Sequence, residues 1–131
     1  MNYDDYSEEV SPKSIRPLHE VRDEAKLLML VEAMQAGGWT GRPLLVVDEG
    51  GGDYVALTGS HRLAAALESG LSEVPVVVVP QCERLTVEPV LGGVDVCFDG
   101  VRLSEDDERL AAMEELGHEV AAHMMRVEMV K

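Results

Sequence analysis

The stretch that decides the fold is Thr58-Gly59-Ser60-His61-Arg62, which separates an apolar run from an alanine-rich run. The run before it, residues 54–57, includes aromatic and β-branched side chains that suit a half-buried strand. The run after it, residues 63–69, consists of helix formers, with Ser60 as the expected N-cap and Gly70 as the expected left-handed C-terminal residue. The sequence therefore predicts a strand, a glycine turn and a helix N-terminus in succession.

The start of this helix predicts an anion-binding site. The first amides of a helix have no partners within the helix, and the helix dipole places partial positive charge there. His61 and Arg62 add side-chain donors, and Gly59 allows a ligand to approach the backbone without meeting a Cβ atom. The alternative that these five residues leave open is a capped turn followed by a solvated arginine.

Length and charge restrict the class of protein. A chain of 131 residues is expected to form one domain with a sizeable core. Its 11 basic and 25 acidic residues give a formal net charge of −14, which disfavours binding to nucleic acid or to anionic lipid. The two cysteines form no disulfide framework, and no apolar run is long enough to span a bilayer, so we expect a cytoplasmic protein without a membrane segment.

The chain is predicted to divide into three parts. Residues 1–13 are acidic and lack periodicity, so we expect a flexible arm. Residues 14–80 are the expected core, with an edge strand at 15–18, a helix over 23–36, a glycine-rich hairpin joining 44–47 to 54–57, and a central buried strand at 75–80. Residues 81–131 are the expected extension, with strands at 85–90 and 94–98 and helices that begin at a Ser104 cap. The predicted class is α+β, a small mixed sheet packed by helices.

The C-terminal region carries a methionine-rich apolar face. Met113, Met124 and their apolar neighbours follow a helical period, with Gly117 as the expected break between two helices. Core packing is the preferred interpretation, and contact with a protein partner or a second copy is the alternative. His118 and His123 are five positions apart, which turns a helix by roughly 500°. A zinc ion shared by these histidines is therefore not expected, and no metal site is assigned.

Several stretches together resemble the sulfiredoxin pattern of the ParB-like/sulfiredoxin superfamily. They are Arg16-Pro17-Leu18, then Asp23, Ala25 and Lys26, then Gly51-Gly52-Asp53-Tyr54, then Gly59-Ser60-His61-Arg62 with Ala64-Ala65. The resemblance covers about residues 14–80. It implies that His61, Arg62 and Lys26 hold nucleotide phosphates, with Arg16, Gly59 and Ser60 as the remaining nucleotide contacts.

Two departures from the sulfiredoxin pattern bear on activity. Ser60 stands where the family has its reactive cysteine, so repair of a sulfinic acid is not expected. Met29 and Ala33 replace helix hydroxyls that the family places near the nucleotide, which puts the binding mode of adenine nucleotides in doubt.

A catalytic carboxylate is implied by a looser positional match. Glu20 stands where ParB-like enzymes that phosphorylate free serine have their base, and Ser60 and His61 complete the implied catalytic set. In that mechanism Mg²⁺ and Arg62 stabilise the transferring phosphoryl group. An ordinary surface glutamate is the alternative interpretation of Glu20.

The expected function is nucleotide binding at the Gly59–Arg62 turn. The expected cofactor is ATP or another nucleotide with Mg²⁺, used by a phosphotransferase with a small-molecule or protein hydroxyl as acceptor, or by an NTPase. The alternative is a ParB-like regulatory or protein-interaction module without activity. The net charge and the lack of a basic helix-turn-helix segment argue against direct DNA contact.

Overall fold

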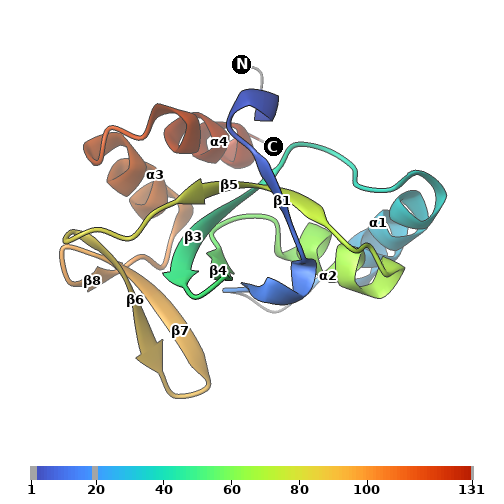
Figure 1. Ribbon diagram of the computed structural model, residues 1–131, viewed down its shortest axis with the longest axis horizontal. Helices are drawn as coiled ribbons and strands as arrows, with labels where there is room; N and C mark the ends of the chain where they lie inside the picture. Colours follow the sequence, from blue (N-terminus) through green and yellow to red (C-terminus); the bar gives the residue numbers. More distant parts are fainter. Residues whose placement is uncertain (1–2, 19–20, 131) are drawn as a thin grey trace.

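The computed structural model describes residues 3–18 and 21–130, which form two sheets and the helices that cover them (Figure 1). The main sheet contains β1 (Glu8–Val10), β2 (Ile15–Arg16), β3 (Leu44–Gly50), β4 (Asp53–Ala56) and β5 (Val74–Val79). The second sheet contains β6 (Leu85–Val90), β7 (Gly93–Phe98) and β8 (Val101–Arg102). The helices are α1 (Glu24–Gly37), α2 (Ser60–Ser69), α3 (Asp106–Glu115) and α4 (Glu119–Met129), with short 3-10 turns at Tyr3–Asp5 and Pro12–Ser14.

The main sheet is mixed, and its strand order is β1-β5-β3-β4-β2. β3 and β4 form the predicted antiparallel hairpin, whereas β3 pairs with β5 and β4 pairs with β2 in parallel. The α+β class and the edge position of the strand before Pro17 are thus confirmed. The valine-rich strand β5 is an inner strand of the sheet, as predicted, since it lies between β3 and β1, and β3 occupies the middle position.

Helices cover both faces of the main sheet (Figure 1). Alternate residues of β3 point to opposite faces, as the pleat of a strand requires. Leu44 and Val46 pack with α1 and α2, while Leu45 and Val47 pack with α3, α4 and the second sheet. All four side chains are fully buried. The C-terminal extension therefore completes one of the two core clusters.

The acidic N-terminal segment differs from the flexible arm that composition predicts. Glu8–Val10 pairs antiparallel with β5 over three residues and closes that edge of the sheet. The side chains of Glu8 and Glu9 stay exposed. A backbone ladder needs no apolar side chains, so composition alone gives little sign of it.

Two predicted helix caps are corrected by the structure. Gly59, not Ser60, is the N-cap of α2, and Ser60 is the first helical residue. Glu105, not Ser104, is the N-cap of α3, where Glu105 and Glu108 form a capping box. The Ser104 hydroxyl instead donates to Glu108 Oε1 at 2.9 Å. Relative to the serine caps predicted from the sequence, α2 therefore begins one residue earlier and α3 one residue later.

The methionine-rich face packs into the core. Met113, Met124 and Met125 are at most 2% exposed, and Gly117 adopts a positive φ between α3 and α4 as predicted. His118 caps α4, because its Nδ1 accepts a hydrogen bond from the Ala121 amide at 3.1 Å. No helix in the described part of the chain is long and apolar enough to cross a membrane.

Candidate functional site

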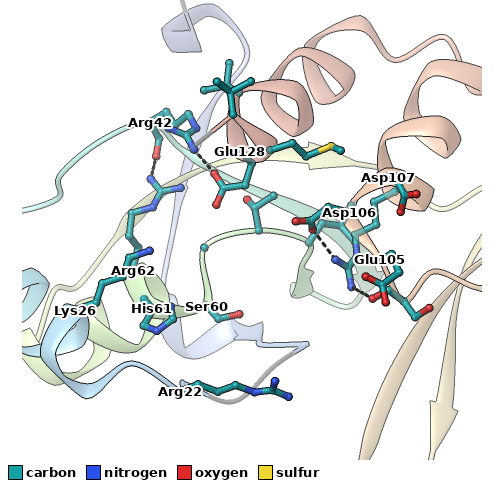
Figure 2. Close-up of a pocket in the computed structure, with 18 of the residues that line it drawn as sticks. Arg22, Lys26, Arg42, Ser60, His61, Arg62, Glu105, Asp106, Asp107 and Glu128 are labelled. Carbon is teal, nitrogen blue, oxygen red and sulfur yellow. Dashed lines mark hydrogen bonds and ion pairs between the residues drawn. The ribbon is translucent and has the colours of Figure 1, made fainter.

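A cavity of about 1140 Å³ lies where the N-termini of α1 and α2 face the C-terminal helices (Figure 2). Residues 58–62, the predicted turn, line it together with Leu57. Its charged lining residues are Arg22, Lys26, Arg42, Arg62, Arg109, Glu105, Asp106, Asp107 and Glu128. Five of the 11 basic residues of this acidic chain thus line one cavity. Such a concentration of cations favours an anionic ligand.

The turn is shaped by Gly59, whose φ of 77° lies in the left-handed region. A Cβ atom at this position would lie 2.4 Å from Leu44 Cδ2, so no larger residue fits without displacing the core. Thr58 is buried, and its Oγ1 accepts a hydrogen bond from the Leu45 amide at 3.2 Å. Together these contacts hold the first amides of α2 at the cavity wall.

Arg62 is a largely buried cation with several neighbours in the site. Its Nη1 donates to the carbonyl oxygen of Arg42, and its guanidinium lies 5.3 Å from the centroid of the Trp39 ring. Burial lowers the pKa of Arg62, the charge of Glu128 opposes that shift, and the charge of Arg42 adds to it. Among the described residues, Arg62 Nη2 is buried without a hydrogen-bond partner. Arg62 therefore fixes the loop before β3, and one of its buried donors stays unsatisfied among the described residues.

Lys26 and His61 lie on the same side of the cavity as Arg62 (Figure 2). The side chain of Lys26 is exposed, and its backbone amide donates to Asp23 Oδ1 at 3.0 Å, which caps α1. His61 Nε2 accepts a hydrogen bond from the Asp23 amide at 3.3 Å. In that bond Nε2 carries no proton, so a phosphate would meet the proton on Nδ1. The structure thus brings Lys26, Gly59, Ser60, His61 and Arg62 to one cavity.

Two predicted site residues are not among this group. Arg16 does not line the cavity, and its Nε instead pairs with Glu49 Oε2 at 3.0 Å on an exposed surface. Glu20, the predicted base, lies outside the described residues. Its catalytic role stays a prediction.

Sequence reasoning missed the contribution of the C-terminal extension. Arg109 is 3% exposed and its Nη1 pairs with Asp106 Oδ1 at 2.9 Å. Arg109 lies three and four positions before the buried Ala112 and Met113, so it shares their helix face. An arginine alone on an apolar helix face is the sequence signal that could have indicated the buried position of Arg109. The acidic wall from residues 105–107 has no such signal, because its position depends on how the extension folds back.

The cavity has a basic side and an acidic side. Arg22, Lys26, Arg42 and Arg62 come from the core. The extension contributes the acidic Glu105, Asp106 and Asp107, with Arg109 paired to Asp106, and it also contributes Glu128, which pairs with Arg42. Within residues 3–18 and 21–130, no group of three or more acidic, histidine or cysteine side chains is placed to hold a metal ion. The protein is thus an α+β domain with a bipolar cavity at a helix N-terminus.

The chain belongs to the ParB N-terminal domain family, whose family model matches residues 6–92. The predicted resemblance is confirmed at this level. No curated protein sequence is similar enough to this chain to count as a match.

Solved structures share the fold. ParB from Caulobacter crescentus, a C-terminally truncated chromosome-partitioning protein complexed with CTP-gamma-S, has a TM-score of 0.51 and 24% identity over 59% of this chain and 46% of its own. A conserved hypothetical protein from Pyrococcus furiosus has a TM-score of 0.50 and 20% identity, over 82% of this chain and 45% of its own. Sulfiredoxin from Arabidopsis thaliana has a TM-score of 0.49 and 22% identity, over 57% of this chain and 85% of its own. This chain spans less than half of the ParB structure that it matches.

Proposed function

We propose that this protein binds a nucleotide, with its phosphates at the N-terminus of α2. The observation that carries the proposal is the set of cations around the Gly59–Arg62 turn in a chain of net charge −14. Lys26 and Arg22 line the cavity beside the turn, and neither has an ion-pair partner among the described residues. Their charges are available to phosphate, for which charge-assisted hydrogen bonds are the stronger kind.

The size of the cavity supports a ligand as large as a nucleotide. Pockets for small molecules and cofactors are typically about 300–1,000 Å³, and this cavity, at about 1140 Å³, is slightly larger than that range. The solved ParB structure holds CTP-gamma-S, and we extend nucleotide binding from it to this chain as part of the proposal. ATP and CTP are both candidates, because nothing in the cavity selects one base.

Mg²⁺ is expected to enter with the phosphates. It usually binds through one or two carboxylates plus substrate phosphates and waters, so it does not need a complete protein cage. Asp106 and Asp107 supply carboxylates on the wall opposite the basic side. When bound, the ion would neutralise part of the phosphate charge near this acidic wall.

Phosphoryl transfer is the second candidate function, since Ser60 and His61 lie in the same cavity as the proposed phosphate site. His61 Nδ1 is free of the bond that occupies Nε2, so its N–H can donate a hydrogen bond to a phosphate oxygen. Glu20 remains the proposed base for a hydroxyl acceptor. A regulatory module that binds nucleotide without turnover is the alternative, and a turnover assay separates the two.

The test is a titration with ATP, ADP and CTP, with and without Mg²⁺. Binding is followed by the fluorescence of Trp39, the one tryptophan of the chain, and by the melting temperature. At a hundred-fold excess over Kd, ligand stabilises the fold by about 2.7 kcal/mol. Release of phosphate in the same samples measures turnover.

A matched pair of lysine variants locates the site. Lys26→Ala is expected to weaken binding about ten-fold, the equivalent of one charge-assisted hydrogen bond. Lys13→Ala removes an exposed lysine that does not line the cavity, and is expected to change nothing. Absence of any shift at millimolar nucleotide would overturn the proposed function, and equal effects of the two variants would place the phosphates elsewhere.

A further inference from the structure

Two charged residues join the basic side of the cavity to the C-terminal helix. Arg42, just before β3, forms an ion pair through Nη2 with Glu128 Oε2 in the last turn of α4 (Figure 2). The side chains are 31% and 18% exposed, so the pair is partly shielded from water. The same Arg42 accepts a hydrogen bond from Arg62 through its carbonyl oxygen. Glu128 is therefore an acid held beside two arginines of the proposed phosphate site.

The electrostatic effect of Glu128 is that of a bound anion. Burial lowers the pKa of Arg62 and the neighbouring Arg42 lowers it further, whereas Glu128 raises it. The carboxylate thus stabilises the charged form of a crowded arginine pair. A phosphate is also an anion with oxygen acceptors, and it can bind the same guanidinium through charge-assisted hydrogen bonds.

Glu128 is also poorly placed in its own helix. It lies in the last turn of α4, where the helix dipole disfavours a negative side chain. Glu128 is therefore held at this helix end mainly by its partner Arg42. A ligand phosphate can therefore compete for Arg42 without breaking the core contacts of α4, which involve Met124 and Met125.

We propose that Arg42 is a specificity-determining phosphate contact, which Glu128 occupies until a ligand with at least two linked phosphates displaces it. The inference rests on the proposed function, because the first phosphate is taken to lie at the N-terminus of α2. A monophosphate fills that position alone and leaves the Arg42–Glu128 pair intact. A nucleoside diphosphate or triphosphate extends to Arg42 and exchanges one anion for another. The preferred ligand class is therefore a nucleoside diphosphate or triphosphate.

The test compares ATP, CTP, AMP and CMP on the wild type and on Glu128→Gln, using isothermal titration and Trp39 fluorescence. Glutamine keeps the shape of the side chain and removes its charge, so the variant is expected to bind the triphosphates about ten-fold more tightly, the effect of freeing one charge-assisted bond. Its affinity for the monophosphates is expected to change less than two-fold. Glu119→Gln is the control, since Glu119 is on the same helix but does not line this cavity.

Arg42→Gln provides the converse measurement. It is expected to weaken triphosphate binding about ten-fold and to spare monophosphate binding, and the double variant is expected to lose most of the gain seen in Glu128→Gln. If one of the single variants is destabilised, the other still tests the proposal, because each changes a different partner of the Arg42–Glu128 pair.

The outcomes separate the two proposals. Tight binding by the wild type with no gain in Glu128→Gln, or an equal gain for monophosphates, overturns the role of Arg42 and leaves the proposed function standing. Binding by Glu128→Gln where the wild type binds nothing at millimolar concentration supports both proposals. Absence of binding in both proteins overturns both.

Discussion

Replacing Gly59 by alanine tests whether the phosphate turn is built on the core. Gly59 and Gly70 flank α2 and have nearly the same φ, 77° and 74°. A Cβ atom at Gly59 would lie 2.4 Å from Leu44 Cδ2, whereas a Cβ atom at Gly70 would meet nothing within 4 Å. Gly70→Ala therefore carries the backbone cost alone, and Gly59→Ala carries the same cost plus a steric overlap with a fully buried leucine.

The backbone cost and the cost of the steric overlap with Leu44 can be estimated separately. Placing an L-residue in the left-handed region costs about 1–2 kcal/mol. Overpacking a core site costs about 1–3 kcal/mol more. Gly70→Ala should thus lower the free energy of unfolding by about 1–2 kcal/mol, and Gly59→Ala by about 2–5 kcal/mol. The gain from restricting the unfolded chain is the same for both variants and cancels in the comparison.

Urea and thermal unfolding followed by circular dichroism measure the difference. Domains of this size typically have a stability of about 5–15 kcal/mol, so Gly59→Ala should remain folded but melt well below Gly70→Ala. Equal losses in the two variants would refute the close approach of Gly59 to Leu44. Because the same overlap displaces the first amides of α2, Gly59→Ala should also weaken nucleotide binding, and Gly70→Ala should not.

Four further predictions concern single side chains. Lys26→Gln should raise the melting temperature of the ligand-free protein and reduce the shift that ATP or CTP produces, because it removes a cation from the first turn of α1. Arg16→Ala should leave nucleotide affinity in a titration unchanged, since that side chain does not line the cavity. Glu108→Ala should lower the melting temperature at pH 7. Hydrogen bonds from the Ser104 hydroxyl and from the amides of the capping box lower the pKa of Glu108 below its usual 4.5, so the difference from wild type should fade as pH falls through that lowered value. Finally, an overoxidised peroxiredoxin incubated with this protein, ATP and thiol should show no reduction of its sulfinic acid, because Ser60 supplies no thiolate; measurable repair would contradict that chemistry.

Features that depend on near neighbours could be read from the sequence. The hairpin follows from apolar runs on either side of a glycine-rich turn, and the start of α1 follows from the Asp23 cap. The break at Gly117 has the same local origin. The caps of α2 and α3 show the limit of such rules. Gly59 is the N-cap with a left-handed φ, and the side chain that leaves no room for a Cβ atom there belongs to Leu44, 15 positions away in the chain.

Features that depend on distant contacts could not be read in this way. β1 exists because an open edge of β5 accepts a backbone ladder, to which the side chains of Glu8 and Glu9 contribute little. Arg16 carries the same charge as Lys26, yet it turns to Glu49. The acidic wall of the cavity forms only when α3 packs on the face of β3 that α1 and α2 leave free. None of these three features has a signal in the residues next to it in the sequence.

The placement of two cations is the strongest argument that the cavity serves a ligand. Counting from the N-caps, Lys26 is the third residue of α1 and Arg62 is the third residue of α2. Positive side chains in a first helical turn oppose the helix dipole, and carboxylates are the usual choice there. α3 follows the usual choice, with Asp106, Asp107 and Glu108 in its first turn. Acidic residues are abundant in this chain, yet the first turns of α1 and α2 each contain a cation. The positive ends of both helix dipoles therefore lie beside these two cations at one cavity. That arrangement costs stability in the empty protein, and an anion with several negative charges removes the cost.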